Sequence, residues 1–423
     1  MTAAFLRLNA RTFASLRASR NYRYFFAGQV VSQTGSWMQR IAQGWLVLQL
    51  THSPVAVGIL ALAQFLPFTV FGLFAGVIVD RLDARRTVIG TQAAQMVLAS
   101  VLATIALAGI ATPWEVYLLA ALNGLVLVLD APSRQQLTYR MVGPLELPNA
   151  VALNSSLFNA ARIFGPAVGG VLIAAVGVGW CFGINAISFL AVLAGLFAMR
   201  TSEFFPLERR ARPPILRGTR DGLAYVRSRP TMLIILALTL VISLFCLNFN
   251  VLLPVLAKRT LEAGPQTLGL LSALFGAGAL VGALVAANRG RASLRWMIGG
   301  AAVFTTAEFL LAPERSIPLV GALLFVAGVG FTVWSANSNS ALQLAAPDHM
   351  RGRVVGLYFY AFNGSGPFGG ILAGWLSARG GTTLALFVGG AVGLAGTAVA
   401  AARLRGQRRP SEPLRPLANR ARA

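Results

Sequence analysis

Residues 76–86 have the sequence Gly-Val-Ile-Val-Asp-Arg-Leu-Asp-Ala-Arg-Arg and separate two apolar runs, at about 55–79 and 87–110. Each run is long enough to cross a bilayer as a helix, because a span needs ~20 mostly apolar residues. Basic residues gathered in a short loop are typical of the cytoplasmic side of a membrane. This stretch therefore predicts two membrane helices joined by a short basic loop.

The same alternation of apolar runs and basic loops continues in both directions along the 423-residue chain. Only 12% of the residues are charged and 56% are hydrophobic, whereas a soluble domain has about 25% charged residues. The length of the runs favours helices over barrel strands of ~10 residues. We therefore predict an all-α membrane protein with twelve transmembrane helices, at about 25–50, 55–79, 87–110, 114–133, 152–176, 179–199, 231–257, 267–288, 294–312, 317–343, 354–376 and 380–402.

The twelve runs form two similar sets of six. Gly165-Pro166-Ala-Val-Gly-Gly lies in the fifth run, and Gly366-Pro367-Phe-Gly-Gly lies in the eleventh, the fifth of its own half. Two pseudo-symmetric halves are the plan of a parallel-repeat transporter, with the substrate site between them. We expect five segments: an N-terminal segment at 1–24, six-helix halves at 25–199 and 231–402, a central loop at 200–230 and a basic tail at 403–423.

The net charge of +23 is distributed along the chain rather than on one compact face. Thirty of the 36 basic residues lie in segments on one side of the expected membrane, and four lie on the other. This bias predicts that both termini are cytoplasmic, and it argues against a nucleic-acid partner. We expect a monomer in the plasma (inner) membrane of a bacterium. The two cysteines, Cys181 and Cys246, lie inside apolar runs and predict no disulfide, metal site or cofactor.

The loop at 76–86 resembles the loop signature of the major facilitator superfamily, which is Gly, three residues, Asp, Arg, any residue, Gly and two basic residues. Gly76, Asp80 and Arg81 match this signature, and Arg85 fits the second basic position. Asp83 replaces the second Gly, and an alanine replaces the first basic residue. The alternative is an ordinary basic loop that reflects only the orientation in the membrane.

Other segments resemble the enterobactin-exporter-like branch of this superfamily. They are Thr34-Gly-Ser-Trp-Met-Gln-Arg40, Asp130-Ala-Pro-Ser-Arg-Gln135, Leu147-Pro-Asn-Ala-Val-Ala-Leu-Asn-Ser-Ser156 and Arg162-Ile-Phe-Gly-Pro166. The resemblance covers residues 20–402. It implies the major facilitator fold, alternating access and export of small siderophore-, drug- or metabolite-like molecules, coupled to protons. It leaves the substrate open.

Three alternatives remain open beside an exporter. They are an importer, a sensor and a lipid scramblase on the same fold. A membrane enzyme or an ATP-driven pump is disfavoured, because the sequence contains no Gly-x-x-x-x-Gly-Lys-Ser/Thr phosphate loop and no His/Asp/Glu metal cluster.

The resemblance also implies roles for two motifs. The loop residues Gly76, Asp80, Arg81, Arg85 and Arg86 would latch the cytoplasmic side, with Asp80 meeting the start of the eleventh span near Arg353. The stretch Gly165, Pro166, Gly169 and Gly170 resembles an antiporter motif, although Ala161 stands where that motif prefers Gly. Its alternative role is close packing through small residues.

Charged residues inside the spans usually have partners or a function, because burial of an ionised group in a bilayer costs at least ~2.5–3.5 kcal/mol. Asp130 can pair with Arg134 or with Arg162, either as a static ion pair or as a protonatable switch. Glu308 lies near Pro313, and we expect it to be exposed at the outer interface.

Gln33, Trp37 and Arg40 recur at intervals of four and three residues, roughly on one helical face of the first span. In this position Arg40 could hold an anionic or catecholate-like group, or it could bond to backbone carbonyls instead. The remaining cavity candidates lie on the seventh and tenth spans: Asn248, Asn250, Trp334, Asn337 and Asn339.

Overall fold

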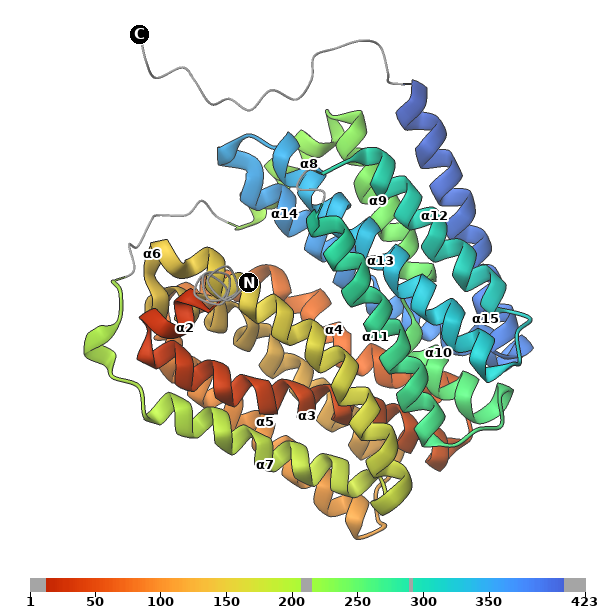
Figure 1. Ribbon diagram of the computed structural model, residues 1–423, viewed down its shortest axis with the longest axis horizontal. Helices are drawn as coiled ribbons and strands as arrows, with labels where there is room; N and C mark the ends of the chain where they lie inside the picture. Colours follow the sequence, from red (N-terminus) through yellow and green to blue (C-terminus); the bar gives the residue numbers. More distant parts are fainter. Residues whose placement is uncertain (1–12, 207–214, 289–291, 407–423) are drawn as a thin grey trace, which may run out of the picture.

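The computed structural model describes residues 13–206, 215–288 and 292–406, and within these ranges it contains helices and no strands (Figure 1). Residues 1–12 of the expected N-terminal segment and residues 407–423 of the expected basic tail lie outside the described residues. The helices of the first half are α2 (Ala14–Ala18), α3 (Arg20–Thr51), α4 (Pro54–Asp80), α5 (Ala84–Leu107), α6 (Pro113–Val176) and α7 (Val178–Phe197). After η1 (Thr201–Glu203) and α8 (Ile215–Arg227), the second half contains α9 (Pro230–Phe245), α10 (Phe249–Val255), η2 (Leu256–Thr260), α11 (Pro265–Asn288), α12 (Leu294–Leu311), α13 (Ile317–Ala345), α14 (Asp348–Asn363) and α15 (Gly366–Gly406).

The helix α6 contains two expected spans, and α15 contains the end of the eleventh span and the whole of the twelfth. In α6, Gly143 adopts φ 71°, a left-handed conformation that glycine tolerates without steric cost, and the chain turns there. In α15, Gly381 adopts φ 67° and divides the helix in the same way. The seventh expected span comprises α9 and α10, and the eleventh comprises α14 and the first part of α15.

Nine stretches of the described residues are long and apolar enough to cross a membrane. Two of these stretches, which contain the breaks at Gly143 and Gly381, are each long enough for two spans, so the total is eleven spans. The helix α3 would be the twelfth. The polar residues of α3, among them Gln33, Gln39, Arg40 and Gln43, lower its apolar content. The prediction of an all-α membrane protein is confirmed, while the status of α3 as a span stays a prediction.

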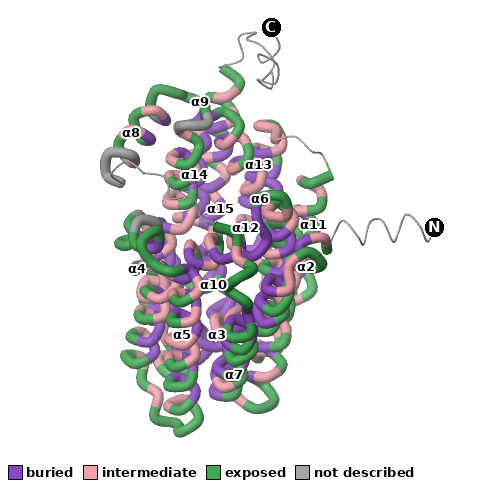
Figure 2. The backbone as a smooth tube through the Cα atoms, turned by 90° about the vertical axis from the view of Figure 1, so that its left-hand side faces the viewer, coloured by how far each residue is buried: buried purple, intermediate pink, exposed green. Residues whose placement is uncertain are grey.

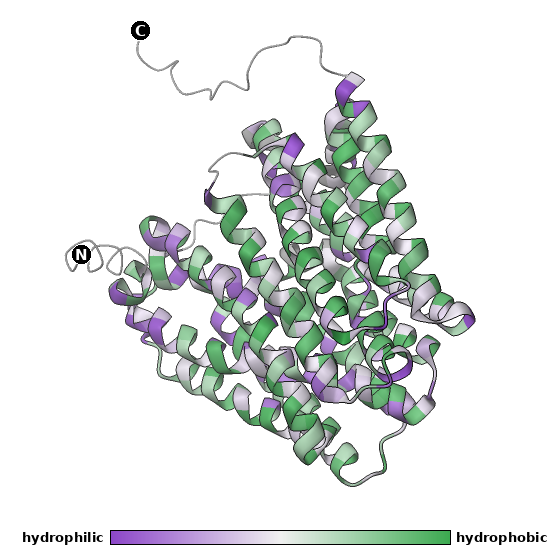
Figure 3. Ribbon diagram, turned by 45° about the vertical axis from the view of Figure 1, so that its right-hand side comes forward, coloured by the Kyte–Doolittle hydropathy of each residue, from purple (hydrophilic) through white to green (hydrophobic). Residues whose placement is uncertain are grey.

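The helices pack into two halves. In Figure 1, α3 to α7 lie together on one side and α9 to α15 on the other, and α6 contacts α11 and α4 contacts α15 across the boundary. Figure 2 shows buried residues inside each half and exposed residues on the outer surfaces. Many exposed residues are apolar, because these surfaces would face lipid rather than water. Figure 3 shows hydrophobic residues along the helices of both halves.

The two faces of the helix bundle differ in how closely the halves approach. We call the face where α4 ends and α9 begins the terminal face. The face where α3 ends and α11 begins is called the opposite face. Toward the opposite face, a Cβ atom on Gly170 of α6 would lie 2.8 Å from the Cα atom of Gly269 of α11. There too, the guanidinium of Arg259 donates a hydrogen bond to the backbone carbonyl of His52. Small residues thus allow the backbones of the two halves to touch.

The expected central loop contains helix α8. Asp221 of α8 pairs with Arg353 of α14, with 3.2 Å between the carboxylate and guanidinium atoms. The side chains of both residues are partly exposed. This ion pair attaches the segment between the halves to the second half at the terminal face.

Candidate functional site

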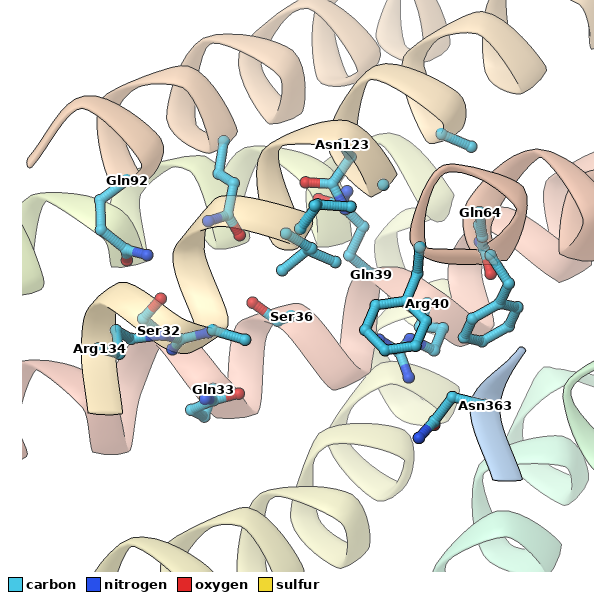
Figure 4. Close-up of a pocket in the computed structure, with 18 of the residues that line it drawn as sticks. Ser32, Gln33, Ser36, Gln39, Arg40, Gln64, Gln92, Asn123, Arg134 and Asn363 are labelled. Carbon is cyan, nitrogen blue, oxygen red and sulfur yellow. The ribbon is translucent and has the colours of Figure 1, made fainter. Parts of the chain in front are cut away.

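A cavity of about 510 Å³ lies among α3, α4, α5, α6 and α7, with Phe359 and Asn363 of α14 also lining it. We call it the central cavity (Figure 4). Its volume is within the range of sites that bind small molecules. Its lining combines phenylalanines with ten amide side chains, which are Gln33, Gln39, Gln43, Gln64, Gln92, Gln95, Asn123, Gln135, Asn185 and Asn363.

The amides face one another and the cavity because exposure to lipid would leave their donors and acceptors unsatisfied. Gln64 of α4 donates to Gln43 of α3 at 3.0 Å, and Asn185 of α7 donates to Gln39 of α3 at 2.7 Å. These cross-helix hydrogen bonds hold α3 against its neighbours. They position α3 so that its other polar residues border the cavity.

Asp130 lies at the centre of a buried polar network in the first half. Its Oδ1 atom accepts hydrogen bonds from the Thr91 hydroxyl at 2.6 Å and from the Gln92 amide at 3.0 Å. Its Oδ2 atom lies 2.5 Å from the guanidinium of Arg134, which also donates to Gln29 of α3 at 2.8 Å. Of the two partners considered from the sequence, the structure therefore pairs Asp130 with Arg134. The network joins α3, α5 and α6, and Arg134 borders the central cavity.

A smaller pocket of about 120 Å³ lies between the two halves, and we call it the inter-half pocket. Trp37, Arg40 and Arg162 line it from the first half, and Asn250 and Phe275 are among the lining residues of the second. Arg40 also lines the central cavity, so the two spaces share this side chain. A third cavity of about 920 Å³ lies within the second half, bordered by α8, α9, α12, α13 and α15.

Four of the eight cavity candidates from the sequence border the central cavity or the inter-half pocket: Gln33, Trp37, Arg40 and Asn250. The other four candidates line neither of these two spaces. Trp334 is fully buried and stacks on Phe362. Asn337 accepts a hydrogen bond from the backbone N–H of Ser293 and fixes the start of α12. Asn248, which lies between α9 and α10, donates to the Leu244 carbonyl of α9, and Asn339 accepts from Gln343 within α13.

The expectation that Glu308 is exposed at the outer interface is wrong, because its side chain is fully buried in the second half. Gly389 and Gly393 of α15 make room for the carboxyl group and for the neighbouring Cys246 thiol. That thiol donates to the Gly389 carbonyl at 3.3 Å. Among the described residues, no basic side chain forms an ion pair with Glu308. The spacing from Pro313 could not reveal this, because the packing depends on glycines about eighty residues further along the chain.

The basic loop between α4 and α5 lies at the terminal face. Asp83 caps α5 by accepting from the backbone N–H of Arg86 at 2.9 Å, and it pairs with Arg140 at 3.0 Å. Partial burial alone would raise the pKa of Asp83, but these two contacts hold its pKa below the ordinary value. Arg85 donates two hydrogen bonds to the Leu196 carbonyl of α7. The exposed Asp80 and Arg81 stand at the end of α4.

The glycines of the fifth-span motif face two different helices. A Cβ atom on Gly165 would lie 2.5 Å from the Trp37 Cβ of α3, and one on Gly169 would lie 3.1 Å from the Met38 Cγ. Gly170 instead approaches Gly269 of α11. Gly165 and Gly169 therefore pack α6 against α3 of its own half, and Gly170 packs α6 against α11 of the other half.

Sequence reasoning missed most of the amides of the central cavity, such as Gln64, Asn123, Asn185 and Asn363. Each is an isolated polar residue within an apolar run, and this signal was available in the sequence. Only the packing of α3 to α7 with one another and with α14 brings these residues to one cavity.

Comparison with known proteins identifies the family. Residues 10–419 match the model of the transmembrane secretion effector family. The chain belongs to this family. It is 30% identical over 360 residues to the multidrug efflux pump Tap of Mycolicibacterium fortuitum, a match that covers 81% of this chain and 86% of that protein. It is 24% identical to the staphyloferrin A transporter of Staphylococcus aureus, covering 79% and 84% of the two chains.

Solved structures agree on the fold. The nucleoside transporter NupG superposes with a TM-score of 0.72 at 13% sequence identity, covering 91% of this chain and 99% of that one. The resemblance to the major facilitator superfamily is thereby confirmed, and the chain is a multi-pass membrane transporter with relatives that are efflux proteins.

Proposed function

We propose that this chain exports small amphipathic molecules from the bacterial cytoplasm across the inner membrane, as a monomer that exchanges them for protons. The observation that carries the proposal is the central cavity, whose amides and phenylalanines can bind both the polar and the apolar part of one molecule. The efflux functions named for the relatives support the same direction of transport.

The distribution of arginines supports a cytoplasmic terminal face. The halves touch toward the opposite face, through Gly170 and Gly269 and through Arg259 and His52. With the terminal face in the cytoplasm, this conformation is the inward-facing one, ready to take substrate from the cytoplasm. Export then requires the halves to rock, so that they close at the terminal face and open at the other.

Asp130 is the proton carrier in this proposal. As a carboxylate it holds Arg134, and a proton on Asp130 would weaken that attraction. Arg134 would then be free to move toward the central cavity, which it borders, or toward Gln29, with which it already bonds. Protonation would thereby change the network that joins α3, α5 and α6.

The loop residues Gly76, Asp80, Arg81, Arg85 and Arg86 form the terminal-face gate in this proposal. In the present conformation Arg353 of α14 is engaged with Asp221 of α8. Closure of the terminal face would bring the end of α4 toward the start of α14, where Asp80 could compete for this arginine. The gate would then be an exchange of ion-pair partners.

Transport into inside-out membrane vesicles tests the proposal. Vesicles that contain the chain should accumulate macrolides, amphipathic dyes or catechol carboxylates when respiration acidifies their interior, and vesicles without the chain should not. Accumulation only by right-side-out vesicles would identify an importer. Movement of fluorescent lipid between leaflets, with no movement of any of these solutes, would identify a scramblase.

A further inference from the structure

Two arginines from different helices approach the same indole ring beside the inter-half pocket. The guanidinium carbon of Arg40 lies 4.6 Å from the ring centroid of Trp37, and that of Arg162 lies 6.0 Å from the same centroid. Arg162 also lies 4.8 Å from the ring of Phe275 and 5.0 Å from that of Phe331. Because these two phenylalanines belong to α11 and α13, Arg162 spans the boundary between the halves.

Neither guanidinium group forms an ion pair or a hydrogen bond with the part of the chain that the structure describes. The two acidic residues within the membrane core are engaged elsewhere, since Asp130 holds Arg134 and Glu308 lies in the second half beside Cys246. Two neighbouring cations in a medium of low dielectric constant repel each other and are costly to bury. Aromatic faces offset part of this cost. They do not accept the two parallel hydrogen bonds that a guanidinium group can donate to a carboxylate.

The positions of these arginines make their donors accessible to a ligand. Arg40 lines both the central cavity and the inter-half pocket, and Arg162 lines the pocket. Arg134 also lines the central cavity, but its charge is compensated by Asp130. Arg40 and Arg162 therefore supply the uncompensated positive charge of the two spaces, and no acidic residue is among the described lining residues. This electrostatic environment favours an anion and disfavours a cation.

The sizes of the two spaces suggest how a molecule divides between them. About 120 Å³ in the inter-half pocket suits one small charged group, whereas about 510 Å³ in the central cavity suits a ring system. A planar carboxylate, or a sulfonate or phosphate, can take paired hydrogen bonds from a guanidinium. The amides and phenylalanines would contact the rest of the molecule.

We propose that the inter-half pocket binds the anionic group of the transported molecule through Arg40 and Arg162, and that the substrates are therefore amphipathic organic anions. This inference rests on the proposed export function and specifies its substrate class. The anion would be held between α3 and α6 of one half and α10 and α11 of the other. Its charge would offset the repulsion between the guanidinium groups of Arg40 and Arg162, so its binding would bring the halves together around it.

Three probes that share one ring system and differ in charge test the inference: naphthoate, naphthalenemethanol and naphthylmethylamine. Their binding to the purified full chain is measured by calorimetry in a neutral detergent. We expect naphthoate to bind about tenfold or more tightly than the alcohol, because hydrogen bonds between ionised groups are roughly twice as strong as neutral ones. The amine should bind most weakly, because the arginines repel its charge.

Substitutions then assign the preference to the two arginines. Arg40→Gln and Arg162→Gln should each weaken naphthoate binding about tenfold and leave the affinity for the alcohol nearly unchanged. Arg379→Gln is the matched control, because Arg379 lies 4.6 Å from the Trp375 ring and lines neither space. Arg40→Lys should retain part of the preference for the anion, because lysine keeps the positive charge but cannot donate two parallel hydrogen bonds to a carboxylate.

The inference is overturned if the amine binds as tightly as naphthoate, if naphthoate fails to bind at millimolar concentration, or if the Gln variants weaken all three probes equally. Transport of the same probes, in vesicles of zwitterionic lipid, separates this inference from the proposed function. Export of the amine in preference to naphthoate would leave the export function standing and refute the anionic substrate class. Naphthoate that binds through the two arginines, in vesicles that transport none of the probes, macrolides or dyes, would support the anion site and refute the export function.

Discussion

Asp130 and Arg134 lie one turn apart on α6, with 2.5 Å between Oδ2 and Nη2, and the carboxylate of this pair is fully buried. The other carboxylate oxygen accepts hydrogen bonds from Thr91 and Gln92 of α5. The Arg134 side chain, by contrast, is partly exposed and borders the central cavity. The pair therefore connects a buried acid to the space in which the substrate would bind.

Exchange of the two charges distinguishes a proton switch from a static ion pair. Asp130→Arg alone should destabilise the protein by about 3–5 kcal/mol, because it leaves buried charge uncompensated. Combining it with Arg134→Asp should recover part of this stability without restoring proton-coupled transport, since Thr91 and Gln92 are placed to donate to a carboxylate. Thermal unfolding and vesicle transport are the measurements. Transport at the wild-type rate by the double variant would show that the pair is static.

The terminal-face gate predicts different effects for two neighbouring aspartates. Asp80→Asn should lower transport several-fold with normal membrane insertion, because the amide loses the charge that attracts Arg353. Asp83→Asn is the control, since asparagine can still cap α5. Transport rates normalised to protein in the membrane give the comparison. An unchanged rate in Asp80→Asn would remove this residue from the gate.

Asp83 should also make a pH-dependent contribution to stability. Its pKa is below the ordinary value in the folded chain, so its charge stabilises the folded state above the pKa of the unfolded chain. This contribution is lost as the pH falls through the folded-state pKa. We expect the difference in Tm between wild type and Asp83→Asn to be constant near neutral pH and to shrink below about pH 4. A difference that grows with acidification would contradict the assigned ion pair with Arg140.

The contact between Gly170 and Gly269 predicts that a single methyl group disturbs the interface between the halves. A Cβ atom on Gly170 would lie 2.6 Å from the Pro265 carbonyl oxygen, which is backbone and cannot rotate away. Gly170→Ala should cost about 1–3 kcal/mol and slow transport. Gly90→Ala of α5 is the control, because no atom lies within 4 Å of its added Cβ, and it should be neutral or stabilising by up to about 1 kcal/mol. Equal behaviour of the two variants in thermal unfolding would refute the interface role of Gly170.

The fold was predictable from the sequence because the bilayer imposes long apolar helices, and their runs are visible without any tertiary information. The roles of Gly143 and Gly381 as breaks between spans agree with the expected loops near them. The polarity of α3 also indicated a helix that borders a cavity, and its side chains Gln33 and Arg40 line the central cavity.

The site was predictable only in part, because it depends on which faces meet. Trp334 and Asn337 are residue types that often line cavities, but here they pack α13 against α12 and α14. Glu308 has the sequence position of an interface residue, yet glycines of α15 enclose it. Arg162 was considered as a partner of Asp130, and its contacts with Phe275 and Phe331 follow from the approach of the second half. Such relationships between distant helices are absent from local sequence patterns.

Proton movement in proteoliposomes tests the central claim, proton-coupled export, most directly. The purified chain is reconstituted, a pH gradient is imposed, and dyes, macrolides and organic anions are added one at a time. Proton-coupled export through Asp130 predicts that a substrate collapses the gradient with the wild type and with Glu308→Gln, because the Glu308 carboxyl group is buried away from both substrate spaces. It predicts no collapse with Asp130→Asn. Substrate movement that leaves the gradient intact in the wild type, or full coupling in Asp130→Asn, would contradict it.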